Sequence, residues 1–177
     1  ALIDLAKTRL LENLLQPPYR FVIPDVLYAD EIITLRHYHR EQLLDIGFEL
    51  GTLDGPQVGK ASAYSQQYPQ LSLNDCFALV MAQTTPDAIL LTGDQRLRRV
   101  AEQQSVAVHG ILWILDQAYE QGTVDAVTLH AALFLLAVHL GRRTGALGEA
   151  AAAELLHELL SVPAKIGEAV ETAVQVQ

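Results

Sequence analysis

Isolated carboxylates are the residues of this sequence whose types and positions suggest chemistry. Asp94 directly follows the apolar run AILLTG and stands where a helix should begin, with the Thr92 hydroxyl two residues earlier to orient a carboxylate or a water molecule. Asp75 falls in the first turn of an earlier helix, which Ser72 can cap, and Asp30 and Glu31 lie in the helix that follows FVIP. Carboxylates in oxygen-rich surroundings suit Mg²⁺ or Mn²⁺, so the expected chemistry is metal-assisted.

Each carboxylate also has a structural interpretation. Asp94 could simply cap the following helix, and Asp75 could be a favourable charge near the positive end of its helix. Asp30 and Glu31 could be exposed surface residues. The functional interpretation depends on the set as a whole: acids at strand ends and helix starts, with no basic partner beside them and no alternative nucleophile.

Other chemistries fit this sequence poorly. It has no Gly-rich phosphate-binding loop and no G-x-S-x-G nucleophile elbow. His37 and His39 are two residues apart and would point to different faces of a helix, so they make a poor zinc pair. Cys76 sits in an apolar helix, where we expect it to be buried rather than nucleophilic.

Alternating strands and helices must position these acids. Strands are predicted at Phe21–Ile23, Ile46–Leu53, Ala88–Leu91 and Val106–Val108, with helices between them and a first helix over Asp4–Leu15. This alternation is typical of an α/β fold with a central parallel sheet, in which ligands gather at the carboxyl ends of the strands. From Ile111 onward the chain is predicted to be helical, in segments broken at Gly122, Gly141–Gly148 and Pro163.

Composition sets limits on the function. The 177 residues carry a formal net charge of −9, which argues against binding nucleic acid through overall charge and leaves only local basic patches. The single cysteine indicates a reducing compartment such as the cytoplasm. The longest uncharged stretch, Ala126–Gly141, is shorter than the roughly 20 residues that cross a bilayer. It therefore predicts a buried or partner-covered helix and no membrane span.

Two pairs of segments resemble the PIN domain, the fold of VapC-type toxin ribonucleases and their relatives. LSLNDCFALVMAQ followed by AILLTGDQRLRRVAEQQSVAVHGILWIL is similar to the second half of that domain, and ALIDLAKTRLLENLL followed by FVIPDVLYADEI is similar to the first half. The resemblance implies a three-layer α/β/α nuclease domain with a central parallel sheet over residues 1–121. A helical extension would occupy residues 122–177.

The resemblance also assigns roles to the acids. It implies that Asp30, Asp75 and Asp94 are catalytic and bind Mg²⁺ or Mn²⁺, with Glu31 as the alternate to Asp30 and Thr92 in support. The family's first aspartate would precede Ala1, and Asp4 lies a turn too far along to replace it. An aspartate upstream would favour the nuclease, and its absence would favour a degenerate PIN-like binding or scaffold protein.

The implied reaction is hydrolysis of RNA phosphodiester bonds by a metal-activated water. Arg96 and Arg99 after Asp94, and Arg36 and Arg40 after Asp30, are candidates for holding RNA phosphates, with ordinary solvated helix faces as the alternative.

Tyr38, Tyr28 or Trp113 could stack a base, although packing at the core or its rim is the alternative role of each. VapC-like proteins are held inactive by a protein antitoxin, so the resemblance implies such a partner. The apolar helices from Thr123 to Leu160 could contact it or form a homodimer.

Overall fold

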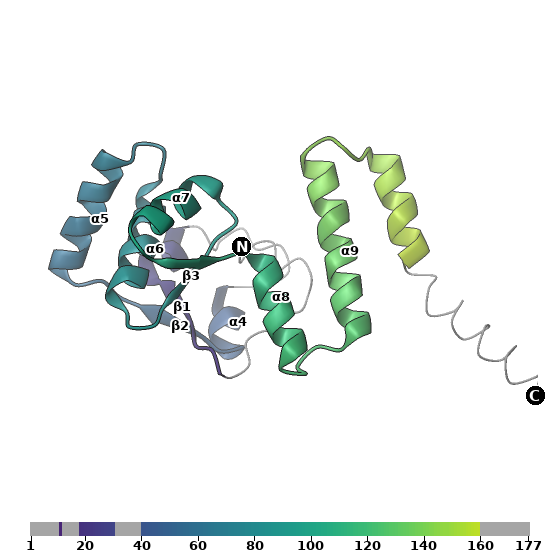
Figure 1. Ribbon diagram of the computed structural model, residues 1–177, viewed down its shortest axis with the longest axis horizontal. Coiled ribbons are helices and arrows are strands. Elements are labelled where there is room, and N and C mark those ends of the chain that lie inside the picture. The colour runs from purple at the N-terminus through teal and green to yellow at the C-terminus, as the bar shows by residue number, and fades with distance from the viewer. Residues whose placement is uncertain (1–10, 12–17, 31–39, 160–177) are drawn as a thin grey trace, which may run out of the picture. The chain divides into compact units, whose positions relative to one another are not determined.

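The computed structural model describes residue 11 and residues 18–30 and 40–159 (Figure 1). The chain forms two compact units, Ala1–Asp125 and Ala126–Gln177. Leu11 is helical and buried. The rest of the predicted first helix, Asp4–Leu15, and the helical segment expected after Pro163 lie outside the described residues.

Two pairs of parallel strands form the sheets described in the first unit. β1 (Phe21–Pro24) pairs with β2 (Phe48–Gly51), and β3 (Ile89–Leu91) pairs with β4 (Ala107–His109). The predicted mixed α/β class is confirmed, and the strands are parallel as expected. The predicted single central sheet is not seen in the described residues. The strands there form two separate two-stranded sheets.

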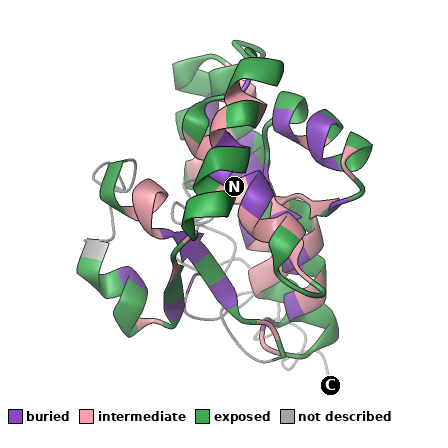
Figure 2. Ribbon diagram, turned by 90° about the vertical axis from the view of Figure 1, so that its left-hand side faces the viewer, coloured by how far each residue is buried: buried purple, intermediate pink, exposed green. Residues whose placement is uncertain are grey.

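The helices alternate with these strands. They are α3 (Asp25–Asp30), α4 (Arg40–Asp45), α5 (Gly55–Gln67), α6 (Leu73–Thr84), α7 (Gln95–Gln103) and α8 (Ile111–Glu120). α6 contacts both β1 and β3, so it links the two sheets. The elements differ in how deeply they are buried (Figure 2). β1 buries three of its four residues, whereas the buried residue of α5 is Ala61.

All four strands differ from their predicted bounds. β1 takes in Pro24, which was expected to follow it, and β3 begins at Ile89 rather than Ala88. The strand expected over Ile46–Leu53 is confined to β2, since Ile46 and Gly47 form the turn that ends α4. Gly47 has a φ of 114°, a conformation that glycine adopts without strain. The strand expected at Val106–Val108 begins one residue later, because Ser105 adopts a positive φ of 58° and the N–H of Val106 bonds back to α7 at Ala101.

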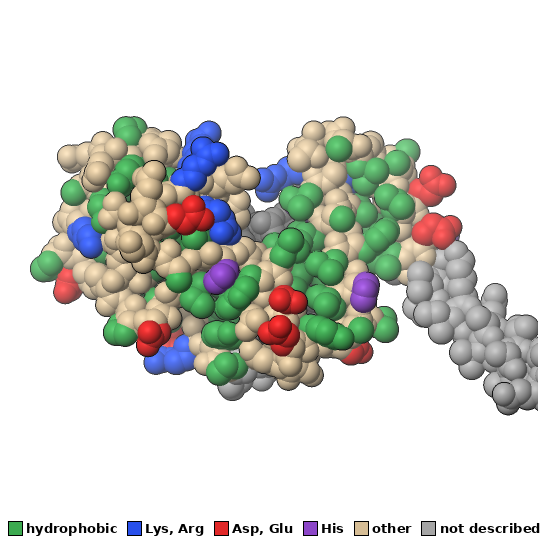
Figure 3. Space-filling model, in the orientation of Figure 1, with side chains coloured by type: hydrophobic (Ala, Val, Ile, Leu, Met, Phe, Trp, Pro, Cys, Tyr) green, Lys and Arg blue, Asp and Glu red, His purple; other side chains and the backbone are tan. Residues whose placement is uncertain are grey.

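The second unit contains α9 (Ala126–Arg143) and a helix over residues 149–159. The predicted break over Gly141–Gly148 is confirmed, since α9 ends at Arg143 and the next helix begins at residue 149. Because Gly141 has no side chain, Leu147 can pack closely against it. A Cβ added at Gly141 would lie 3.0 Å from the Cβ of Leu147. Hydrophobic side chains gather over α9 (Figure 3), and Val127 is 73% exposed. None of the described helices is long and apolar enough to cross a membrane.

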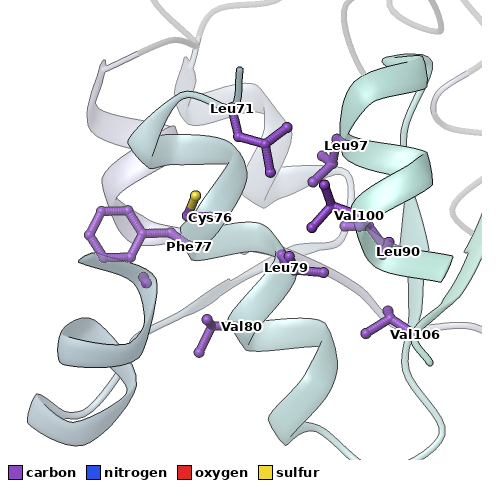
Figure 4. Packing of buried hydrophobic residues seen from close by; sticks show 11 residues of the cluster. Leu71, Cys76, Phe77, Leu79, Val80, Leu90, Leu97, Val100 and Val106 are labelled. Atoms are coloured by element: carbon purple, nitrogen blue, oxygen red, sulfur yellow. The ribbon is translucent and has the colours of Figure 1, made fainter. Parts of the chain in front are cut away.

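The core of the first unit is built around α6. Leu79, Val80 and Cys76 are fully buried, and Leu90 from β3 and Val100 from α7 join the same cluster (Figure 4). α6 therefore packs between a strand and a neighbouring helix, which fixes where its first turn, with Asp75, is presented.

Candidate functional site

Asp94 caps helix α7 immediately after β3. Its Oδ1 accepts hydrogen bonds from the backbone N–H groups of Arg96 at 2.6 Å and Leu97 at 3.3 Å. The side chain is exposed, and the cap uses one of its two oxygens. The structural interpretation of Asp94 is thus confirmed, and the second carboxylate oxygen remains for another role.

Thr92 fixes the turn that carries Asp94. Its hydroxyl accepts a hydrogen bond from the backbone N–H of Asp94 at 3.0 Å, and its own N–H donates to the carbonyl of His109 at 3.0 Å. Among the described residues, Thr92 is the one polar residue that is buried. The sequence predicts that Thr92 orients a carboxylate or a water, whereas the structure shows it orienting the backbone of Asp94.

Asp75 forms a capping box with Ser72 at the start of α6. Its Oδ2 accepts from the backbone N–H of Ser72 at 2.9 Å and from the Ser72 hydroxyl at 2.7 Å, and its own N–H donates to that hydroxyl at 3.1 Å. The predicted Ser72 cap is confirmed. Asp75, like Asp94, therefore commits one carboxylate oxygen to a helix start.

Cys76 follows Asp75 and is buried, as predicted. Burial, with a smaller contribution from the negative charge of Asp75, raises the pKa of the Cys76 thiol. A protonated, inaccessible thiol is a poor nucleophile, so cysteine chemistry does not compete with the carboxylates as an explanation of this site.

The remaining predicted residues are placed in part. Asp30 is exposed and ends α3, a helix that contacts α6. Glu31 and Arg36 lie outside the described residues, and Arg40 begins α4 with a side chain that is not described.

The donor chemistry of the acids fits a hard cation, but their number does not make a complete site. Carboxylate oxygens are the ligands that Mg²⁺ and Mn²⁺ prefer. Within the described ranges, no three His, Cys, Asp or Glu side chains come close enough together to hold a metal ion. Asp75 and Asp94 therefore supply suitable oxygens without forming a metal centre by themselves.

The arginines of α7 divide into two kinds. Arg96 and Arg99 are exposed, as a phosphate-binding role requires. Arg98 is partly buried, and its Nη1 donates to the carbonyl of Val108 at 3.3 Å, at the end of β4. The contact of Arg98 with Val108 could not be predicted from the sequence, because it depends on how α7 packs against β4.

An aromatic cluster lies at the same end of β4. The His109 and Trp113 rings are stacked, with centroids 4.4 Å apart and an angle of 9° between the planes. Tyr19 meets Trp113 edge-on at 5.5 Å and donates its hydroxyl to Gln117 at 2.7 Å. His109 is not among the predicted site residues; its spacing of four residues from Trp113, at the start of a predicted helix, is the signal that could have found it.

Comparison with known proteins identifies the family. A family model described as a PIN domain matches residues 1–144, which takes in all of the first unit and all of α9. Neither a curated protein nor a solved structure matches the chain significantly. The predicted PIN resemblance is confirmed, while its VapC-type subgroup stays a prediction. Because the match covers most of the chain, the protein belongs to the PIN domain family.

Proposed function

We propose that this protein is a metal-dependent ribonuclease that hydrolyses RNA phosphodiester bonds. The observation that carries the proposal is the position of Asp94, directly after β3 and at the start of α7, in a chain with the PIN fold. PIN domains have a nuclease-type fold, are generally hydrolases and typically use divalent metal ions. Asp75, at the start of the neighbouring helix α6, is the second acid of the proposed site.

The chain's own residues would divide the work. In this proposal Asp75, Asp94 and Asp30 supply carboxylate oxygens. The capping box with Ser72 holds Asp75 in place, and the hydrogen bond to the Thr92 hydroxyl holds the backbone of Asp94. Bound Mg²⁺ or Mn²⁺ would supply Lewis acidity toward a phosphate and a water. The exposed guanidinium groups on α7 would hold flanking phosphates, which offsets the repulsion between RNA and the acids.

The direct test is cleavage of a mixed single-stranded RNA with Mn²⁺, with Mg²⁺ and with EDTA. We expect cleavage only with metal, and no cleavage by Asp94→Asn, which keeps a capping side chain but loses the charge. Asp54→Asn is the matched control, because Asp54 is also an exposed N-cap aspartate just beyond a strand, at the start of α5. Equal activity of the wild type and Asp94→Asn would refute the site assignment.

Metal binding has its own test, independent of cleavage. We expect Mn²⁺ to raise the thermal midpoint of the wild type, since a ligand that binds only the folded state stabilises it. Asp75→Ala should lose this metal-dependent increase. Comparing each protein with and without Mn²⁺ removes the cost of losing the Asp75 cap. An unchanged increase in Asp75→Ala would exclude Asp75 as a ligand.

A degenerate PIN-like binding protein is the second candidate. It is favoured by the lack of a three-ligand cluster among the described residues, and by the structural use of both Asp75 and Asp94 as helix caps. A folded protein that shows neither cleavage nor metal-dependent stabilisation would establish this candidate over the nuclease.

The proposal extends to the cellular role and to partners. We propose that the protein is the toxin of a toxin–antitoxin pair, acting in the cytoplasm and inhibited by a protein antitoxin. Induced expression of the wild type should then arrest growth, and expression of Asp94→Asn should not arrest it.

We also propose a homodimer through the exposed apolar residues Val127, Leu133 and Leu140 of α9. Sedimentation equilibrium should show a dimer that Leu133→Asp dissociates, and a monomeric wild type would contradict it.

A further inference from the structure

The stacked rings of His109 and Trp113 form a flat aromatic surface. Their 4.4 Å separation and 9° interplanar angle describe a nearly parallel stack, whereas Tyr19 contacts Trp113 by an edge. Neither stacked ring is fully buried. Within the described part of the chain, Trp113 is the ring neighbour of His109, so His109 ends the aromatic series. A parallel stack that ends in a partly exposed ring can be continued by another flat ring.

This aromatic surface is tied to the turn that carries Asp94. His109 lies opposite Leu91 in the β3–β4 pair, and its carbonyl accepts the N–H of Thr92. The hydroxyl of Thr92 in turn holds the N–H of Asp94. Two hydrogen bonds of Thr92 therefore connect the backbone of His109 to that of Asp94, so the two residues lie at the same end of the β3–β4 pair.

Positive charge lies at this edge as well. Arg98 reaches the end of β4, where its Nη1 bonds to Val108 and its Nη2 would lie 3.4 Å from a Cβ added at Gly110. Proteins that bind single-stranded nucleic acid combine such cations for the backbone with aromatic rings on which bases stack. A parallel aromatic pair next to an arginine has both components.

We propose that His109 and Trp113 form a stacking platform for one base of single-stranded RNA, beside the proposed site at Asp94. The inference rests on the proposed function, because it supplies the nucleotide contact for that site. The base continues the stack on the His109 ring, and the guanidinium of Arg98 lies near the adjoining backbone. Stacking tolerates any base, so the platform positions the strand without reading its sequence.

The chain's single tryptophan gives a direct readout, because Trp113 is itself in the platform. Fluorescence is measured while an oligoadenylate of about ten nucleotides is added in EDTA, so that no cleavage occurs. An abasic oligomer of equal length carries the same phosphates without bases. We expect the oligoadenylate to change Trp113 emission and to bind about tenfold more tightly than the abasic oligomer. Equal affinity and equal emission changes for the two oligomers would overturn the proposal.

Variants of His109 separate stacking from charge. His109→Ala should weaken oligoadenylate binding about tenfold and leave abasic binding unchanged, whereas His109→Phe should retain wild-type affinity because it keeps a flat ring. Leu112→Ala is the control, since Leu112 is 58% exposed and immediately precedes Trp113 on α8. Wild-type affinity of His109→Ala would also overturn the proposal.

The two proposals fail in different ways. If the oligoadenylate changes Trp113 emission in EDTA and the abasic oligomer does not, but no RNA is cleaved with metal, the platform is retained and the nuclease is rejected. Metal-dependent cleavage with no difference between the oligoadenylate and the abasic oligomer would retain the nuclease and reject the platform.

Discussion

The backbone N–H of Asp94 donates to the hydroxyl of Thr92 at 3.0 Å, so a buried side chain sets the backbone of the residue at the proposed site. The carboxylate of Asp94 then accepts from the first N–H groups of α7. Asp94 is held on both sides, through its own N–H and through one carboxylate oxygen. Its other carboxylate oxygen is therefore presented from a fixed position.

Replacing Thr92 with valine tests this arrangement. Thr92→Val keeps the shape of the side chain but removes the acceptor for the Asp94 N–H, and we expect it to lower the free energy of unfolding by about 1–3 kcal/mol. Thr92→Ser keeps the hydroxyl and should lose less. Urea unfolding measures both proteins. Equal midpoints for the valine variant and the wild type would show that this hydrogen bond does not stabilise the turn.

Two substitutions of Asp94 should separate its effect on stability from its effect on activity. Asp94→Ala removes the cap of α7 and should cost about 1 kcal/mol in the free energy of unfolding, whereas Asp94→Asn keeps a capping oxygen and should stay close to the wild type. Both variants should lose cleavage, because the charge is absent from each. Urea unfolding and RNA cleavage are measured on the same preparations. An active alanine variant would assign Asp94 to capping alone.

Local signals in the sequence predicted most of the elements. Ser72 and Asp94 mark helix starts because short polar side chains satisfy the first N–H groups of a helix, and the structure confirms both caps. The apolar run at Ala88–Leu91 predicted β3, which occupies Ile89–Leu91. The end of α9 at Arg143 was predicted only as a break within Gly141–Gly148, because local signals locate the end of a helix only approximately.

The site was predictable only in part, for the same physical reason. The types and positions of Asp75 and Asp94 follow from local pattern, whereas the pairing of strands into two sheets depends on long-range hydrogen bonds. The position of His109 beside the Thr92 turn depends on the register of β3 and β4. Periodicity in a single sequence carries no information about that register, so Trp113 could be predicted as a stacking residue but the place of His109 beside the Thr92 turn could not.

Replacing Leu79 with alanine tests the hydrophobic core that positions α6. Its side chain is fully buried in the main cluster, so Leu79→Ala should lower the free energy of unfolding by about 2–5 kcal/mol. Leu73 lies on the same helix and is 46% exposed, which makes Leu73→Ala the matched control with a much smaller expected loss. Chemical denaturation of the two variants measures the difference. Similar losses would contradict the assignment of Leu79 to the core.

Two glycines should respond to alanine with opposite signs. A Cβ at Gly51 would lie 2.8 Å from Val22 Cγ1 and 2.7 Å from Met81 Cε, so Gly51→Ala should destabilise the protein by about 1–3 kcal/mol. Gly59 lies inside α5 with open space around it, so Gly59→Ala should stabilise the helix by about 0.5–1 kcal/mol. Thermal and urea unfolding distinguish the signs. A neutral Gly51→Ala would mean that the side chains of Met81 and Val22 both move aside freely.

Cys76 should be unreactive until the protein unfolds. The thiol is fully buried and its pKa is raised, so little thiolate is present and little of it is accessible near pH 8. Because the folded state binds this proton more tightly than the unfolded chain, the stability from this group is complete below the unfolded thiol pKa. It is lost as the pH rises through the folded value.

The measurement is the rate of reaction with Ellman's reagent, in buffer and in guanidinium chloride. We expect slow labelling of the native protein and fast labelling after unfolding. Val127→Cys in a Cys76→Ala background is the control, because position 127 is 73% exposed and its thiol should react at once. Labelling of native Cys76 as fast as that control would mean that the start of α6 opens readily, and the Ser72–Asp75 capping box could then not hold Asp75 in place.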